Sequence, residues 1–121
     1  MAIPQEIQGQ RYINLITFRK TGVAVSTPVW FGEENGKLYV MSQPDSGKAK
    51  RIRNNSAVKI APSTIRGKTK GPEFAASARI LPPEAWPAAR ATINRKYWAA
   101  RLPLWSKKNV YFEIEAGTQK T

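Results

Sequence analysis

The sequence contains no cysteine and no histidine. Without these residues the chain has no disulfide, no thiolate nucleophile, no cysteine-type zinc site and no catalytic triad that depends on histidine. Acidic residues are also scarce, at eight of 121. We therefore predict no catalytic side chain and no metal site, and we expect any demanding chemistry to come from a bound cofactor.

Long apolar runs are absent as well. No segment approaches the roughly 18–20 apolar residues that cross a bilayer. The start of the chain, MAIPQEIQGQ, lacks the basic stretch and apolar core of a secretory signal. These absences predict a cytoplasmic protein with no membrane partner. A length of 121 residues is typical of one domain, so we expect a single domain over residues 1–121, with residues 116–121 as a flexible tail.

Positive charge is what the chain has in excess. Lys and Arg number 20 against eight acidic residues, which gives a formal net charge of +12. Such an excess predicts a negatively charged partner, and nucleic acid, an anionic membrane and a phosphate-bearing small molecule all qualify. Charge alone does not choose between them.

Hydrophobic alternation of period two dominates the chain and predicts extended strands. We expect six of them, at residues 12–18, 23–31, 37–42, 57–62, 73–81 and 109–116. The pair Asn35-Gly36 predicts a tight hairpin turn. Residues 82–98 predict a helix that begins late or kinks at Pro87. Six strands with short turns predict a mainly β fold, a small barrel with flanking helices.

The stretch SQPDSGKAKRIRNN, residues 42–55, predicts a short helix that is basic from its first turn. Asp45 or Ser46 is suited to cap this helix, and Gly47 would let a bound group approach the backbone. The unpaired amide groups of a helix start, together with Lys48, suit a phosphate. The helix carries four cations: Lys48, Lys50, Arg51 and Arg53. A solvated basic face accounts for them equally well, so the motif alone leaves both interpretations open.

Two further segments also allow two interpretations each. In STPVWF, residues 26–31, Pro28 removes a ladder hydrogen bond, so this strand is expected either at a sheet edge or beside a ligand. The loop RGKTKGPE, residues 66–73, is either solvated or extends the positive rim of a site. Its cations are Arg66, Lys68 and Lys70.

The order of these segments resembles that of a known family. From Ile16 to Leu81 the chain carries TPVWF, LYV, SGK, KRIR and GPE in sequence, and KYW and VYFEIEA follow later. This pattern resembles the flavin/deazaflavin oxidoreductase superfamily, the split-barrel proteins related to pyridoxamine 5'-phosphate oxidase, in its coenzyme F420-dependent branch. The resemblance implies a homodimer of six-stranded FMN-binding split barrels, with a cofactor in each of two interface clefts.

The resemblance also implies which residues bind the cofactor. The strand from Ser26 to Trp30 would run beside the ring system, mainly through backbone groups. Met41 and Ser42 would lie near the ribityl chain, and Lys48 matches the lysine that binds the cofactor phosphate. The full implied set is Ser26, Thr27, Pro28, Val29, Trp30, Met41, Ser42, Ser46, Gly47, Lys48 and Arg51.

The sequence departs from the vitamin B6 oxidases of this superfamily. Gly47 stands where those enzymes have arginine, and their C-terminal arginine and histidine have no match, which disfavours oxidation of vitamin B6. Coenzyme F420 carries a phosphodiester and a polyglutamate tail, and this long anion suits a +12 chain better than the single phosphate of FMN. We therefore expect F420 as the cofactor, with FMN as the alternative.

The implied function is hydride transfer between reduced F420 and an electron-poor organic acceptor, such as a conjugated carbonyl, a quinone or a tetrapyrrole. Tyr97, Trp98 and Trp105 would wall the substrate side, or else pack in the core or the dimer. The alternatives are an FMN-dependent oxidoreductase and a non-catalytic carrier of F420, FMN or haem. A nucleic-acid-binding barrel explains the charge but not the helix start or the family pattern, so nucleic acid is the less favoured partner.

Overall fold

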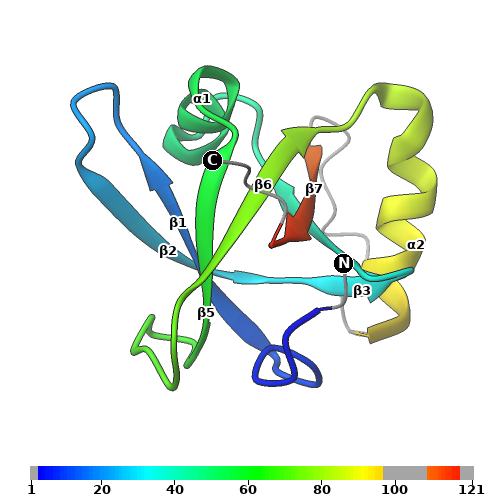
Figure 1. Cartoon of the computed structure of the whole chain (residues 1–121). Helices are drawn as coiled ribbons and strands as arrows, with labels where there is room; N and C mark the ends of the chain where they lie inside the picture. Colours follow the sequence, from blue (N-terminus) through cyan, green and yellow to red (C-terminus); the bar gives the residue numbers. More distant parts are fainter. Residues whose placement is uncertain (1–2, 97–108, 118–121) are drawn as a thin grey trace.

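One antiparallel sheet organises the protein. The computed structural model describes residues 3–96 and 109–117. Seven strands pair in the order β2-β1-β5-β6-β7-β4-β3 (Figure 1). The strands are β1 (Tyr12–Phe18), β2 (Ala24–Trp30), β3 (Gly32–Glu34), β4 (Lys37–Ser42), β5 (Ala57–Ser63), β6 (Phe74–Ile80) and β7 (Val110–Ala116). Among the described residues, two α-helices flank the sheet, α1 (Gly47–Asn54) and α2 (Trp86–Lys96), and the short 3-10 helix η1 (Pro83–Ala85) leads into α2.

The predicted mainly β fold is confirmed, with one strand more than expected. The predicted strand at residues 23–31 ends one residue earlier, and the chain then continues as β3. Only Phe31 separates β2 from β3, yet β2 pairs with β1 and β3 pairs with β4, at opposite ends of the strand order. The chain therefore passes from one edge of the sheet to the other at Phe31. This bend curls the sheet into a barrel.

Helix α2 is fixed against this bend. Gly32 is buried beside the helix, where an added Cβ would lie 2.9 Å from the carbonyl oxygen of Thr92. The Nζ of Lys96 lies 3.4 Å from the centroid of the Phe31 ring and 3.6 Å from the Glu33 carboxylate. A further ion pair joins Arg95 to Glu34. The missing side chain at residue 32 thus sets how closely helix and strand approach.

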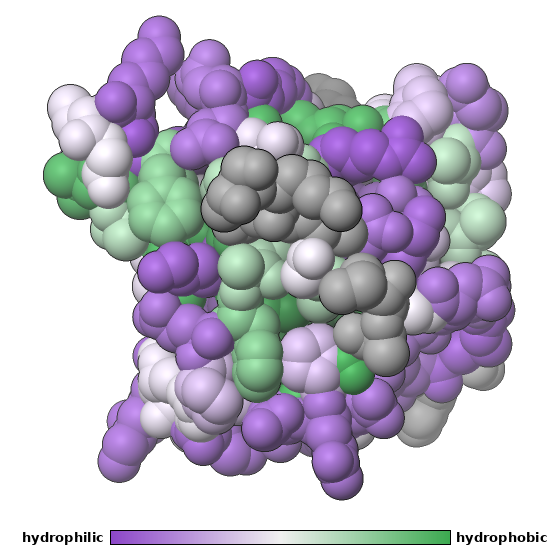
Figure 2. All heavy atoms as spheres, in the orientation of Figure 1, coloured by the Kyte–Doolittle hydropathy of each residue, from purple (hydrophilic) through white to green (hydrophobic). Residues whose placement is uncertain are grey.

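The alternation of the strands divides the apolar residues between two clusters. The larger cluster fills the barrel, and it includes Val110, Phe112 and Ile114, which the sequence places on one face of the last strand. A smaller cluster lies beneath α2 and contains Leu81, Ala89, Ile93 and Tyr111. Hydrophilic residues dominate the periphery of the face seen in Figure 2, as expected when apolar faces turn inward.

The predicted hairpin turn and the late start of the second helix agree with the structure, and the predicted end of that helix at residue 98 lies outside the described residues. Asn35 and Gly36 both have positive φ, 54° and 76°, as a type I′ hairpin requires. Pro87 falls in the first turn of α2, where its missing N–H removes no helical hydrogen bond. No helix in the described ranges is long and apolar enough to span a membrane. Tyr97, Trp98, Trp105 and residues 118–121 of the predicted tail lie outside the described residues.

Candidate functional site

The connection from β4 to α1 is held by two serine hydroxyls. Ser46 is the N-cap, and its Oγ accepts a hydrogen bond from the backbone N–H of Ala49 at 3.1 Å. The Oγ atoms of Ser42 and Ser46 lie 2.8 Å apart, and Ser42 donates to the carbonyl oxygen of Gln43. Ser46, rather than Asp45, is therefore the cap. Both hydroxyls serve this turn, and their role as cofactor ligands stays a prediction.

The guanidinium group of Arg51 folds back over the start of α1. Its Nε donates to Thr17 Oγ1 at 2.6 Å, and a Cβ added at Gly47 would lie 2.7 Å from Nη1. Thr17 is fully buried, so this hydrogen bond fixes the guanidinium to the barrel. Gly47 was expected to leave room for a bound group at the backbone. The structure places Arg51 in that room, so a ligand at this point would meet Arg51 first.

Several cations gather at this end of the barrel. Burial lowers the pKa of Lys48 below its ordinary value of 10.5, and the charge of Arg51 lowers it further. Burial likewise lowers the pKa of Arg51, with a second contribution from the charge of Arg19. Within residues 3–96 and 109–117, no carboxylate forms an ion pair with Lys48 or Arg51; the acidic partners pair elsewhere. Such a cluster favours binding of an anion.

A hollow of about 240 Å³ opens beside this cluster. It is lined by Pro28, Val29, Trp30, Met41, Lys48 and Ile93. The first five belong to the predicted site, so the structure brings together residues from β2, β4 and α1 that the sequence separates. Trp30 remains 40% exposed and packs on Tyr12, with ring centroids 6.4 Å apart. A flat ring system could lie against this tryptophan at the mouth of the hollow.

The remaining predicted residues of β2 lie outside the hollow. Ser26 and Thr27 precede Pro28 on the same strand and do not line it. Among the described strands, β2 stands at one end of the order and pairs with β1 alone. The segment is therefore an edge strand among the described strands, which is one interpretation of the proline, and its last three residues line a hollow. That a ligand lies there stays a prediction.

Two residues of the site were not predicted. Thr17 continues the inward alternation of Ile13 and Leu15, and a polar residue at a core-facing position is a signal that could have revealed it. Ile93 reaches the hollow from α2. No local pattern could have placed Ile93 there, since its position depends on how α2 packs on the barrel.

The second predicted basic cluster lies away from α1. Arg66, Lys68 and Lys70 belong to the loop between β5 and β6, which Figure 1 shows at the opposite end of the sheet from α1. Asn14, buried beneath this loop, donates its amide Nδ2 to the Gly67 carbonyl oxygen at 2.8 Å and fixes the loop. The participation of this loop in binding a long anion stays a prediction.

Two cations of the β1–β2 turn lie near α1, unlike those of the loop between β5 and β6. A hollow of about 580 Å³ at the other end of α1 includes Arg19 and Lys20 of the β1–β2 turn together with Asn54 and Asn55 of the helix end. The positive surface thus extends from the start of α1 toward the β1–β2 turn. No group of metal-ligating side chains is found in the part of the chain that the structure describes.

Comparison with known proteins identifies the fold of this chain. No family model and no curated protein matches the sequence. Solved structures do match. The haem storage protein HutZ from Vibrio cholerae superposes with a TM-score of 0.72 at 15% identity, over 93% of this chain and 85% of that one. A candidate pyridoxamine 5'-phosphate oxidase from Listeria innocua gives 0.66 at 16% identity, over 89% and 85%.

The chain has the split-barrel fold. A protein of unknown function from Agrobacterium tumefaciens shares it, with a TM-score of 0.73 at 17% identity over 88% of this chain. This chain spans about half, 48%, of that protein's length. At such identities the split barrel is what the matches establish. The cofactor and the reaction have to be argued from the residues of this chain.

Proposed function

We propose that this split barrel is a coenzyme F420-dependent oxidoreductase that works as a homodimer. In this proposal it transfers a hydride between reduced F420 and an electron-poor organic acceptor. The observation that carries the proposal is the cationic start of α1, where Lys48 lines an open hollow and the Arg51 guanidinium lies against Gly47. The cofactor, when bound, supplies the reactive hydride, and the protein supplies binding, orientation and exclusion of water.

In the proposal the phosphate end of the cofactor binds at the start of α1. The first amides of a helix have no intrahelical partner, and the helix dipole adds partial positive charge there. Arg51 uses Nε for Thr17 and turns its Nη atoms toward Gly47. In the proposal a phosphate lies between those Nη atoms and Lys48. Its negative charge would offset the burial that lowers both pKa values, and also the smaller contributions of Arg51 at Lys48 and of Arg19 at Arg51.

The ring end of the cofactor would lie along Pro28, Val29 and Trp30. At about 240 Å³ the hollow holds only part of a deazaflavin cofactor. The proposal therefore needs a second copy of the chain to cover the rest, on the side where β2 ends the sheet. A protein that stays monomeric at full cofactor affinity would contradict this part of the proposal.

The choice of F420 over FMN rests on how far the positive charge extends. FMN offers one phosphate, and Lys48 with Arg51 would be sufficient for it. Arg19 and Lys20 continue the positive surface past α1, which suits a longer anion. FMN remains the second candidate, because the same helix start would bind its phosphate. A haem carrier is less favoured, since the chain has no histidine to ligate iron.

Turnover with a chemically reduced cofactor tests the proposed reaction. Reduced F420 should be oxidised in the presence of the protein and an acceptor such as a quinone, followed by the absorbance of the oxidised deazaflavin. Trp30→Ala removes the aromatic surface at the mouth of the hollow and should lower this rate. Lys59 lies on β5, which β1 separates from β2, so Lys59→Ala should leave the rate unchanged. Tight F420 binding with no turnover of any acceptor would leave a carrier rather than an enzyme.

Cofactor affinity should also depend on pH. Burial and the charge of Arg51 lower the pKa of Lys48 below 10.5, the ordinary lysine value. In the free protein the Lys48 ammonium group therefore loses its proton at a lower pH than an ordinary lysine does. An anion binds the charged form, so affinity should fall as pH rises through the lowered pKa. The unfolded chain keeps the proton longer, so the stability of the free protein should instead rise over that window. Titrations across alkaline pH measure both effects, and Lys48→Arg should retain its affinity there.

A further inference from the structure

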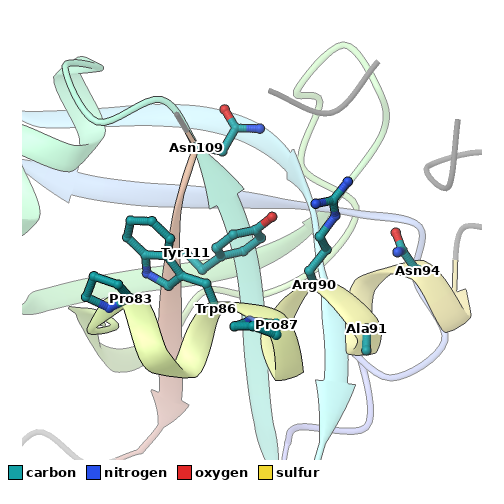
Figure 3. A pocket seen from close by; sticks show the side chains of 8 residues that line it. All are labelled: Pro83, Trp86, Pro87, Arg90, Ala91, Asn94, Asn109 and Tyr111. Atoms are coloured by element: carbon teal, nitrogen blue, oxygen red, sulfur yellow. The ribbon is translucent and has the colours of Figure 1, made fainter. Parts of the chain in front are cut away.

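A separate hollow of about 370 Å³ lies between α2 and β7. The rings of Trp86 and Tyr111 meet along it, with centroids 6.1 Å apart and planes inclined at 51°. The indole is held in place because its Nε1 donates to the Leu81 carbonyl oxygen at 2.9 Å. Pro83 and Pro87 add two more apolar faces (Figure 3). The volume lies in the range of small-molecule sites, and walls of this kind favour a flat ring.

Polar groups gather on one side of this hollow. Figure 3 shows Arg90 extending from α2 on the side where the Tyr111 hydroxyl lies, with the Asn109 amide nearby. Asn109 is 7% exposed and donates one amide N–H to Met41 Sδ at 2.9 Å. Burial raises the pKa of Tyr111 above 10.0, so at neutral pH its hydroxyl keeps its proton and is able to donate.

We propose that the α2–β7 hollow binds a small planar aromatic carboxylate. The ring would lie against Trp86, and the carboxylate would accept hydrogen bonds from Arg90 and the Tyr111 hydroxyl. Arg90 is the one cation among the described residues that line the hollow, which fits a ligand with a single negative charge. A phosphate dianion would instead favour the cluster at α1. This proposal does not depend on which cofactor the protein binds.

Calorimetric titration of the full chain with 2-naphthoate tests this site, with 2-naphthylmethanol as the neutral ligand of the same ring. Naphthoate should bind about tenfold or more tightly than the alcohol, since a charge-assisted hydrogen bond is worth at least that factor. Arg90→Gln should remove this preference and leave the affinity for the alcohol unchanged. Tyr111→Phe, which keeps the ring, should weaken naphthoate binding several-fold.

Lys48→Ala separates this site from the cationic helix start. It should leave naphthoate affinity unchanged, while Arg90→Gln should leave F420 affinity unchanged, so each proposal can fail without the other. Thermal unfolding of each variant shows whether the fold is retained. The aromatic carboxylate site would be overturned if naphthoate did not bind, or if the alcohol bound with equal affinity. It would also be overturned if Lys48→Ala lost naphthoate binding while Arg90→Gln kept it.

Discussion

Replacing Lys48 by alanine is expected to weaken F420 binding by about tenfold or more. The loss of one charge-assisted hydrogen bond costs roughly 1.5–3 kcal/mol, and every 1.4 kcal/mol is about tenfold in affinity. Lys48 lines the hollow and lies beside Arg51, whereas Lys50, the other lysine of α1, does not line the hollow. Fluorescence titration of the variant with F420 measures the effect. The free variant should be at least as stable as the wild type, because a partly buried cation is removed.

Lys50 provides the matched control for this experiment. It lies on the same helix, carries the same charge and is exposed, but it does not line the hollow. Lys50→Ala should change F420 affinity little at physiological salt, since exposed charges are screened beyond about 8 Å. Equal losses in the two variants would reduce the effect to general attraction between a basic protein and an anion. Unchanged affinity in Lys48→Ala would remove this residue from the site.

Gly32→Ala is expected to destabilise the barrel by about 1–3 kcal/mol, the usual cost of overpacking a core. The new Cβ would lie 2.9 Å from the carbonyl oxygen of Thr92 and 3.0 Å from the Cα of Ile93. Both are backbone atoms of α2, so relief requires the whole helix to move away from the bend at Phe31. Chemical denaturation should show a lower midpoint with an unchanged slope.

Gly47→Ala is the informative contrast to Gly32→Ala. There the new Cβ would meet Nη1 of Arg51 at 2.7 Å, the end of a flexible side chain that can move aside. Alanine is also the better residue in a helix. We therefore expect stability equal to the wild type or slightly higher, together with weaker cofactor binding because Arg51 is displaced.

A Gly32→Ala protein within about 0.5 kcal/mol of the wild type, as for ordinary surface changes, would contradict the close packing of α2 on the bend.

The strands were largely predictable because their signal is local. Period-two alternation and the Asn35-Gly36 turn depend on neighbouring residues, and the structure confirms both. The division of the predicted strand at Phe31 was not predictable. An apolar residue continues the alternation equally well through a straight strand or a bend. Only the pairing of β3 with β4 shows that the chain changes edges there.

The candidate site was predictable in part, for the same physical reason. The residues of β2, β4 and α1 that line the hollow belong to short segments with recognisable patterns. The room at Gly47 was also expected, but its occupant was not, since Arg51 reaches it only by bonding to Thr17 of a distant strand. For the basic loop from Arg66 to Lys70 the sequence allows both a solvated loop and an extension of the positive rim. Asn14 hydrogen-bonds to this loop, and the loop's participation in binding stays a prediction.

The central claim is that the start of α1 binds the phosphate of a deazaflavin cofactor. A pair of fluorescence titrations of the purified protein, with F420 and with FMN at physiological salt, tests it most directly. We predict tight binding of F420 and clearly weaker binding of FMN. Tighter binding of FMN would contradict the deazaflavin assignment and point to an FMN-dependent oxidoreductase, whereas binding of neither would contradict the cofactor site itself.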